Sequence, residues 1–389
     1  MKAYQSKILA TAIAGVSALA MAGCGGGDDT ASSGADGNYQ VGVILPLTGP
    51  ASLIGTDFES ALKVFQDIDP DAQDVDIEYV VCDDETTPEG AANCARKLVQ
   101  QDQVDMVFGP ILGGTFEAAK AVLQAGPPTI TSSPYVDPPA GSSVFTASGS
   151  AIDLDRTTLE YAKAKGYQKV AVLAASDTTG QTAVDNLNEL NEEMDLDITV
   201  ETMAPTDVDV SAQLNRLKNT DPDYVYVAAS GAAAGVALKG LDLLGMSDIP
   251  TAMIWSNTTS SFFEAAQDFL PTDLEFAVAP SWLPDELEDA ERAQQVKDFQ
   301  AAFEKETGAA PSFVVQGVYD SFQLISSTLE EGGGDKQKML DYLSGLTDFQ
   351  GLNWTLSYSD ENHRGSDTGN YVMMRYDGAT GSWSLSDPA

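Results

Sequence analysis

Residues 41–67 read VGVILPLTGPASLIGTDFESALKVFQD, and this stretch indicates the type of fold. Its first part, Val41–Leu45, is apolar and mostly β-branched. It lacks the polar alternation of a half-exposed strand, which favours a strand buried on both faces. Gly49 and Pro50 mark a turn, and Ser52–Asp67 has the apolar spacing of an amphipathic helix. A buried strand that leads through a turn into a helix is the unit of an α/β fold with parallel strands.

The same alternation continues along the chain. Short apolar runs predict further strands at Ile77–Cys82, Met106–Phe108, Pro128–Ser132, Val170–Ala174, Ile198–Met203, Tyr224–Ala228, Thr251–Ile254 and Phe276–Ala279. Stretches between them predict helices at Pro88–Gln101, Thr115–Gln124, Leu154–Lys165, Thr182–Met194, Ser211–Asn219, Ala232–Leu244 and Ser260–Phe269. Two consecutive sets of such units predict an α/β protein with two Rossmann-like lobes, each built on a parallel sheet.

The last hundred residues do not repeat this alternation. They predict helices at Glu288–Thr307, Ser312–Glu331 and Gln337–Leu346, followed by strands at Thr355–Tyr358 and Tyr371–Tyr376. This is too little for a third lobe, so we expect the tail to return and complete the other two.

The N-terminus has the pattern of a secretory signal. Lys2 and Lys7 precede a short apolar run, and Met21-Ala22-Gly23-Cys24 resembles a bacterial lipobox, in which the cysteine is acylated. We therefore expect residues 1–23 to be a lipoprotein signal peptide, Cys24 to carry the lipid, and residues 24–38 to be a flexible tether. The alternative is an ordinary secretory signal with a chance cysteine. Either interpretation places the mature protein outside the cytoplasm, and lipidation would anchor it to a bacterial membrane.

The two remaining cysteines favour a disulfide. Cys82 ends a predicted strand and Cys94 lies on the helix that follows, in a compartment that is oxidising. A short bridge between them is sterically reasonable. The alternative is a pair of free buried thiols; metal binding lacks further ligands nearby.

Composition excludes several classes of function. Lys and Arg number 20 against 59 Asp and Glu, so the formal charge of −39 repels nucleic acids and anionic lipid surfaces. The chain has one histidine, His363, in a polar run where we expect it to be exposed, so we expect no metal site, no cofactor and no enzyme activity. The charge also suggests a salty environment, because salt screens the self-repulsion; the unfolding midpoint should then rise with salt.

Candidate binding residues lie where predicted strands end, because ligands of open α/β sheets bind beyond the carboxyl ends of the strands. After Met106–Phe108 comes a glycine-rich turn with Gly113, Gly114 and Thr115, where Thr115 can cap the next helix and free N–H groups favour an anion. The alternative is a plain strand-to-helix turn. No Lys-Ser/Thr follows the glycines, so this is not a phosphate loop. Ser133 and Tyr135 follow the next strand.

Several segments resemble the branched-chain-amino-acid-type (Leu/Ile/Val-binding) solute-binding proteins of ABC importers. They are, in chain order, YQVGVILPLTGP at 39–50, CDD at 82–84, VDMVFGP at 104–110 and VYDS at 318–321. The resemblance covers nearly all of residues 39–378. It implies a type I periplasmic-binding fold, in which two lobes joined by a three-strand hinge close on a ligand. The implied lobes are residues 39–148 with 283–352, and 149–282 with 353–389, with crossovers near Thr146–Ile152, Ala279–Leu283 and Asn353–Ser366.

The resemblance also implies site residues. The family's carboxylate site falls on Gly113, Gly114 and Thr115, with Ser133 and Tyr135. The acid that clamps an α-ammonium in the family's amino-acid binders is replaced by Asn257, and positions with aromatic residues there are occupied by Ile54, Thr179 and Ser230. These departures weaken the case for an amino acid. A neutral Asn257 suits an uncharged end, and Trp255 could cover an apolar body or be simply part of the core.

We therefore expect a monomeric receptor that captures a small carboxylate-bearing metabolite, an amino acid or a related compound, and delivers it to an ABC permease and ATPase. The alternative is a ligand-sensing module of the same fold that signals to a receptor, with an amide or aromatic acid as ligand. A neighbouring kinase gene would favour sensing, whereas permease and ATPase genes would favour transport. A hydrolase is the weakest option, because no nucleophile–base pair can be assembled around one histidine.

Overall fold

The computed structural model describes residues 38–68, 75–365 and 371–386. The predicted signal peptide, Cys24 and almost all of the tether lie outside the described residues. Within the described part, no helix is both long and apolar enough to cross a membrane.

The first sheet is entirely parallel and has the strand order β2-β1-β3-β4-β5. Its strands are β1 (Asn38–Leu45), β2 (Asp76–Asp83), β3 (Met106–Phe108), β4 (Thr129–Thr131) and β5 (Val144–Thr146). The sequence predicted the first four of these strands. It missed β5, which is only three residues long and follows a loop rich in Pro and Ser.

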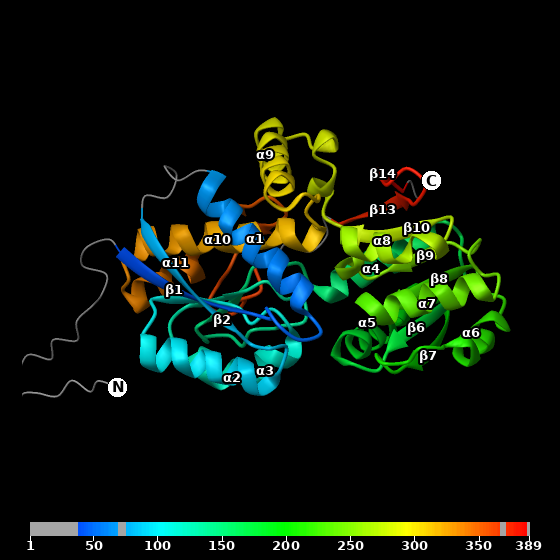
Figure 1. Ribbon diagram of the computed structural model, residues 1–389, viewed down its shortest axis with the longest axis horizontal. Coiled ribbons are helices and arrows are strands. Elements are labelled where there is room, and N and C mark those ends of the chain that lie inside the picture. Colours follow the sequence, from blue (N-terminus) through cyan, green and yellow to red (C-terminus); the bar gives the residue numbers. More distant parts are fainter. Residues whose placement is uncertain (1–37, 69–74, 366–370, 387–389) are drawn as a thin grey trace, which may run out of the picture. The chain divides into compact units, whose positions relative to one another are not determined.

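Helices cover both faces of the first sheet (Figure 1). The helices α2 (Pro88–Arg96), which continues as a π-helical turn over Lys97–Asp102, and α3 (Gly113–Ala125) pack on one face. On the other face lie α1 (Ser52–Ile68) and α10 (Phe313–Gly332). Helix α9 (Ala290–Thr307) packs against α1, and α11 (Lys336–Gly345) packs against α10. Sheet and helices together are called the first lobe. The tail helices α9 to α11 therefore complete the first lobe.

The second sheet has the order β14-β13-β10-β9-β8-β6-β7. Its parallel strands are β6 (Lys169–Ala175), β7 (Asp197–Met203), β8 (Tyr224–Ala228), β9 (Thr251–Met253) and β10 (Leu274–Val278). The tail adds β13 (Val372–Asp377) and β14 (Ser382–Leu385) antiparallel at the edge. The sequence predicted β13 but not β14, because β14 is a short run in which polar and apolar residues alternate.

Helices on both sides complete the second lobe. On one face lie α4 (Ala151–Ala164) and α5 (Thr178–Met194), and on the other α6 (Ser211–Lys218), α7 (Gly231–Leu243) and α8 (Ser260–Ala266). The α/β fold with two parallel-sheet lobes is confirmed. The five parallel strands of each sheet follow the same order, so β3 with α3 corresponds to β8 with α7, and β4 corresponds to β9.

The chain passes between the lobes three times. It leaves β5 for α4, returns from β10 to α9 through short helical turns at Pro280–Trp282 and Pro284–Glu286, and finally passes from a small β11–β12 hairpin to β13. The hairpin strands are β11 (Phe349–Gln350) and β12 (Thr355–Leu356), and they pair only with each other. The strand predicted at Thr355–Tyr358 is thus shorter than expected and joins neither large sheet.

A buried carboxylate fastens the hairpin to α10. Asp320 accepts hydrogen bonds from the backbone N–H groups of Leu352, Asn353 and Trp354 at 2.6, 2.9 and 2.8 Å. Burial raises the pKa of Asp320 to about 7, although these hydrogen bonds lower it. The Asn353 side chain then accepts from Ser281 Oγ at 3.0 Å, which links the third crossover to the second. The crossovers are therefore tied to one another by polar contacts.

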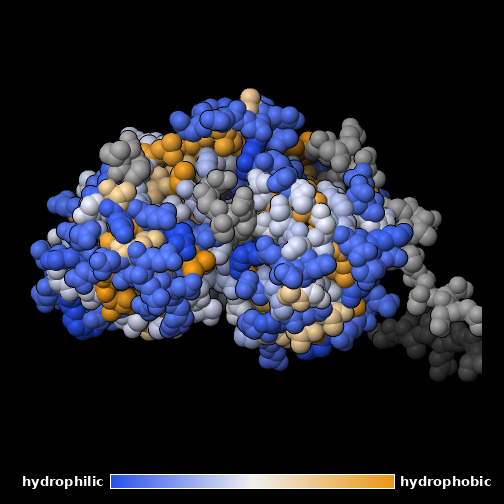
Figure 2. All heavy atoms as spheres, turned by 180° about the vertical axis from the view of Figure 1, so that it is seen from behind, coloured by the Kyte–Doolittle hydropathy of each residue, from blue (hydrophilic) through white to orange (hydrophobic). Residues whose placement is uncertain are grey.

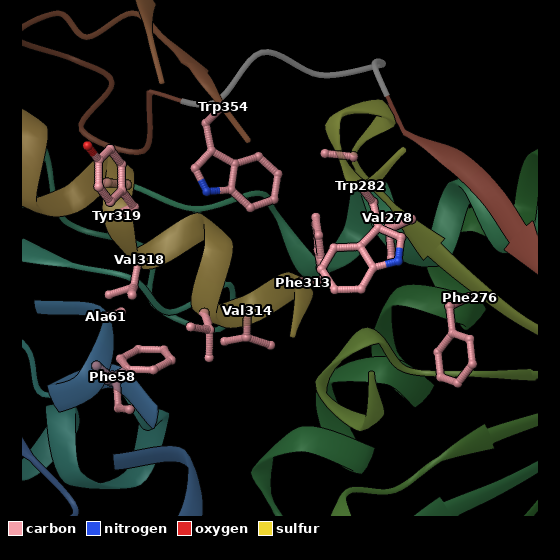
Figure 3. Close-up of a cluster of buried hydrophobic side chains, with 14 of the residues drawn as sticks. Phe58, Ala61, Phe276, Val278, Trp282, Phe313, Val314, Val318, Tyr319 and Trp354 are labelled. Atoms are coloured by element: carbon pink, nitrogen blue, oxygen red, sulfur yellow. The ribbon is translucent and has the colours of Figure 1, made fainter. Parts of the chain in front are cut away.

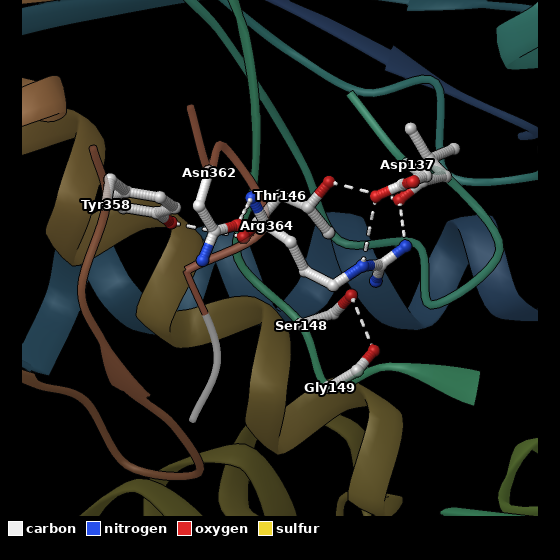
Figure 4. A network of polar contacts seen from close by, with 8 residues as sticks. Asp137, Thr146, Ser148, Gly149, Tyr358, Asn362 and Arg364 are labelled. Atoms are coloured by element: carbon white, nitrogen blue, oxygen red, sulfur yellow. Dashed lines mark hydrogen bonds and ion pairs between the residues drawn. The ribbon is translucent and has the colours of Figure 1, made fainter. Parts of the chain in front are cut away.

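A second set of contacts holds the first and third crossovers together (Figure 4). Tyr358 donates to the carbonyl oxygen of Thr146 at 3.1 Å, and Arg364 donates to Val136 O and lies 3.5 Å from an Asp137 carboxylate oxygen. These contacts bring residues more than 200 positions apart into one joint.

The prediction that His363 is exposed was wrong. Its side chain is buried, its ring stacks on Phe145 with centroids 4.1 Å apart, and Nδ1 lies 3.0 Å from Val144 O. Burial lowers the pKa of His363. The polar run around it is a surface turn, but the third crossover inserts the imidazole beside β5, a tertiary contact that the local sequence does not reveal.

The structure contains the expected disulfide between Cys82 and Cys94, with the sulfur atoms 2.00 Å apart. It joins the end of β2 to α2. Outside the core, hydrophilic residues cover most of the face seen in Figure 2, with apolar residues in scattered patches. This surface agrees with the strongly acidic composition.

Candidate ligand-binding site

The N-terminus of α3 lies immediately beyond the end of β3. Leu112 occupies the N-cap position and provides no side-chain hydrogen bond to the first turn. The first backbone bond of the helix runs from Phe116 N to Leu112 O at 2.9 Å. A helix leaves the N–H groups before that bond without partners, here those of Gly113, Gly114 and Thr115. Together with the helix dipole they form an anion-binding end.

The prediction that Thr115 caps this helix was wrong. Thr115 is the third residue of α3, and its buried hydroxyl donates to Leu112 O at 3.1 Å. The helix begins two residues earlier than predicted, because Gly113 and Gly114, residues typical of a turn, form its first two positions. Because the helix starts at Gly113, the N–H groups of Gly113 and Gly114 also belong to its open first turn.

Two further predicted residues follow β4. Ser133 is fully buried, and its Oγ has no hydrogen-bond partner among the described residues. Such an orphan hydroxyl is costly in a folded protein unless it serves a ligand or water. Tyr135 lies next to the α3 terminus, because a Cβ on Gly113 would be 3.6 Å from the Cβ of Tyr135.

Tyr135 also reaches the second lobe. The same Gly113 position lies 3.6 Å from Cγ2 of Thr178, at the start of α5, and Thr179 hydrogen-bonds to the Tyr135 hydroxyl. Burial, and then the charge of Asp155, raise the pKa of Tyr135. Gly113, Tyr135 and Thr179, predicted as site residues from separate parts of the sequence, are therefore brought together.

The side chain of Asn257 is bonded to the backbone of the second lobe. It is buried after β9, and its Oδ1 accepts from Gly231 N at 2.9 Å while Nδ2 donates to Ala229 O at 2.8 Å and Ile254 O at 3.3 Å. Its side-chain oxygen and nitrogen are thus both bonded to backbone groups, two in the connection from β8 to α7 and one directly after β9. The role expected for Asn257, an uncharged clamp on the ligand, would require these bonds to break.

Ser230 and Ile54 are less directly placed. Ser230 is exposed at the N-cap of α7, and its Oγ lies 2.9 Å from Ser256 Oγ. Ile54 is half-buried in the first turn of α1 and packs against the core. The loop before it is held by Asp83, which accepts from the N–H groups of Leu47 and Thr48 at 2.9 and 3.1 Å.

Trp255 lines a small cavity between the lobes, of about 10 Å³. Its ring packs edge-on against Phe313, with centroids 6.0 Å apart, and Phe313 contacts Trp354 in the same way at 5.5 Å. Figure 3 shows Phe313 and Trp354 extending from α10 and the third crossover. Trp354 Nε1 is buried without a partner among the described residues. The remaining lining residues are Ser132, Pro134, Ser148, Gly149, Leu154, Val314 and Gly317, so no charged side chain lines the cavity.

The sequence missed a buried acid close to Tyr135. Asp155 on α4 accepts from Tyr226 Oη at 2.5 Å and from Asn186 Nδ2 at 2.7 Å. Burial raises its pKa to about 7. In a chain with 59 acidic residues, nothing local distinguishes this one, and only the apolar positions around it on α4 could have indicated an inward-facing acid. The described residues contain no cluster of side chains that could hold a metal ion.

The chain belongs to the periplasmic binding protein family, whose model matches residues 38–381. This confirms the expected family at the level of periplasmic binding proteins. No match was found among curated protein sequences. Members of the family are binding proteins that act outside the cytoplasm.

Solved structures agree with this assignment. An extracellular ligand-binding receptor from Rhodopseudomonas palustris has a TM-score of 0.79 at 19% identity, over 90% of this chain and 100% of that one. A leucine-binding protein from Thermotoga maritima scores 0.77 at 17% identity, over 90% and 98%. A solute-binding protein of an ABC transporter from R. palustris, in complex with benzoate, scores 0.72 at 20% identity, over 90% and 95%. At these identities the likeness concerns the fold.

Proposed function

We propose that this protein is a solute receptor that captures a small carboxylate with an apolar or aromatic body and no ammonium group, and delivers it to an ABC importer. In this proposal Cys24 is acylated and anchors the receptor, as a monomer, to the outer side of a bacterial membrane. The observation that carries the proposal is the open N-terminus of α3 together with the Ser133 hydroxyl after the neighbouring strand β4, which has no partner among the described residues.

The carboxylate is assigned to the first lobe because the donors are there. The N–H groups of Gly113, Gly114 and Thr115 and the hydroxyl of Ser133 can each donate to a carboxylate oxygen. Gly114 is exposed and has no heavy atom within 4 Å of its Cβ position, so a ligand can approach the backbone closely there.

We assign the body of the ligand to the small cavity lined by Trp255, two of whose other lining residues, Ser132 and Pro134, flank Ser133 in the chain. Trp255, Phe313 and Trp354 line it, and none of its lining side chains is charged. Desolvating an ammonium in such a pocket is expensive without a partner. Asn257, which stands where the family's amino-acid binders place an acid, is neutral and hydrogen-bonded to backbone. These features support an aromatic or aliphatic acid over an amino acid.

Capture then requires the lobes to move. The cavity of about 10 Å³ is too small for such a ligand, so the lobes must separate to admit it. Ligand contacts from both lobes would stabilise the closed arrangement and shift the population toward it. Tyr135 and Thr179, which already meet across the lobes, would be among the residues that close over the ligand.

The ligand class is tested by thermal unfolding of residues 25–389 in high salt with benzoate, cyclohexanecarboxylate, benzamide and leucine. A ligand at a hundredfold excess over its dissociation constant stabilises by about 2.7 kcal/mol. We expect the two acids to raise the midpoint and benzamide and leucine to leave it unchanged. A shift with leucine alone would overturn the proposed ligand class.

The binding site itself is tested by Gly113→Pro. Gly113 is the first residue of α3, where proline is tolerated, and Leu112 before it has the extended conformation that proline requires. The variant should fold normally but lack one N–H donor, and should bind benzoate about tenfold more weakly by calorimetry. Gly113→Ala, which keeps the N–H, is the matched control. Equal affinity in both variants would place the carboxylate elsewhere.

A further inference from the structure

A second concave surface is formed by both lobes, apart from the cavity described above. It is a groove of about 800 Å³, within the size range of small-molecule sites. Helix α9 and the loop residues Ala310 and Pro311 before α10 contribute from the first lobe, and α8 with the β13–β14 hairpin contributes from the second. Trp282, on the second crossover, also lines it. We call it the crossover groove.

One wall of the crossover groove is aromatic. Phe263 on α8 stacks on Tyr376 of β13 with centroids 3.8 Å apart, and Trp383 of β14 lies 5.1 Å from Tyr376. Trp383 in turn contacts Trp282 edge-on at 5.7 Å. Tyr376 and Trp383 are only half-buried, so part of this wall faces solvent. An aromatic body of a ligand can pack against it.

The rim of the groove carries unmatched negative charge. Glu264 on α8 and Glu304 on α9 are exposed, and no hydrogen bond or ion pair to either side-chain carboxylate is found among the described residues. The cation that lines the groove, Lys297, lies 2.5 Å from Asp285 and is thus already paired. A cation in the groove would meet two free carboxylates from opposite lobes and the faces of aromatic rings.

We propose that the crossover groove is a second ligand site, which binds a small aromatic amine. The amine lies between Glu264 and Glu304, and its ring packs on Tyr376 and Trp383. This site does not depend on the carboxylate ligand proposed above, because no residue lines both the crossover groove and the small cavity that contains Trp255.

A residue that lines the crossover groove nevertheless contacts a residue that lines the small cavity. Trp282 packs edge-on against Phe313, with centroids 6.2 Å apart (Figure 3), and Phe313 also lines the small cavity that contains Trp255. A ligand in the groove contacts α9 of the first lobe and α8 of the second, so its affinity depends on how far the lobes are apart. By linkage, such a ligand shifts the equilibrium between separated and closed lobes by the same factor by which its own affinity differs between these two arrangements.

The test is titration with phenethylamine, followed by tryptophan fluorescence, since Trp282 and Trp383 line the groove. Phenylethanol has the ring without the charge, and ethylamine has the charge without the ring. We expect saturable quenching by phenethylamine, with a dissociation constant at least about tenfold lower than for either analogue. Equal binding of phenylethanol would show an apolar surface without charge selectivity and overturn the proposal, as would the absence of saturation.

Two variants locate the site. The double variant Glu264→Gln with Glu304→Gln should weaken phenethylamine binding about fivefold, and Ala301→Arg, which places a cation on the exposed lining of α9, should abolish it. The matched controls are Glu189→Gln with Glu192→Gln on the exposed side of α5, and Ala265→Arg beside the groove. An equal loss in the controls would mean that phenethylamine follows only the net charge, and would overturn the proposal.

Discussion

The two lobes place equivalent elements in the same order, but the corresponding helices α3 and α7 begin in different ways. In the first lobe, α3 begins after β3 without a side-chain cap, and Ser133, after β4, leaves its hydroxyl unpartnered. In the second lobe, the first residue of α7, Gly231, donates its N–H to Asn257, which follows β9. The same topology therefore leaves backbone N–H groups free at the start of α3 but bonds the first N–H group of α7 to a side chain.

This difference indicates which lobe meets the ligand first. Free N–H groups at a helix end attract an anion, whereas groups already bonded to a side chain do not. Helix α5 of the second lobe is also satisfied internally, since Asp177 accepts from Gly180 N at 3.0 Å. A carboxylate should therefore bind the first lobe, and the second lobe should close over it with apolar contacts.

The largest expected effect concerns the disulfide, which belongs only to the first lobe. Replacing Cys82 and Cys94 by Ser removes a bridge across a sequence separation of 12, which should cost about 3 kcal/mol of unfolding free energy. Asp83 beside Cys82 holds the loop before α1, so this loop should lose protection together with β2 and α2. Hydrogen exchange measures both. Equal loss of protection in β6 to β9 would show that the lobes do not respond separately.

A buried acid of the second lobe should make stability depend on pH. Burial raises the pKa of Asp155 from 3.8 to about 7, so the folded chain binds a proton that the unfolded chain has released. Stability should therefore rise as the pH falls from 8 to 5.5, by about 2 kcal/mol from this group. Asp155→Asn should lack this part when urea unfolding is measured at both pH values. The dependence that remains in the variant reports other buried acids, among them Asp84 and Asp320 of the first lobe, and the acidic surface.

Ser133 and Asn257, which follow the corresponding strands β4 and β9, should respond in opposite ways to alanine. Asn257→Ala leaves Gly231 N and Ala229 O without their partners, which should cost about 1.5 kcal/mol in urea unfolding. Ser133→Ala removes a hydroxyl that has no partner, so stability should change by less than about 0.5 kcal/mol. Its affinity for benzoate should fall instead. A stability loss in Ser133→Ala as large as in Asn257→Ala would remove the contrast between the lobes.

Most of the fold could be predicted from the sequence because its strands and helices have strong periodicity. The buried runs that became β1, β6 and β8 are five residues or longer, and the structure extends each prediction by at most a few residues. What was missed is short or polar, namely β5, β11 and β14. These strands exist because a neighbouring strand offers a hydrogen-bonding edge, which local pattern does not encode.

The site was predictable in part, for a similar reason. Glycines at a strand end indicate an open helix terminus, so Gly113 and Gly114 could be found from local sequence. His363 and Asn257 could not be interpreted correctly, because their partners, Val144 O and Gly231 N, lie far away in the chain or on another element. The same holds for Asp155, whose partners come from α5 and β8.

The smallest expected effect separates capping from charge at the closed edge of the second lobe. Asp177→Ala leaves Gly180 N unbonded at the start of α5, which should cost about 1 kcal/mol of unfolding free energy. Asp177→Asn keeps an oxygen acceptor and loses only the charge, so thermal or urea unfolding should find it close to the parent protein. If Asn were as costly as Ala, the carboxylate would act on the helix dipole and not as a hydrogen-bond acceptor. The second lobe would then be closed to anions by repulsion, and salt should weaken that barrier.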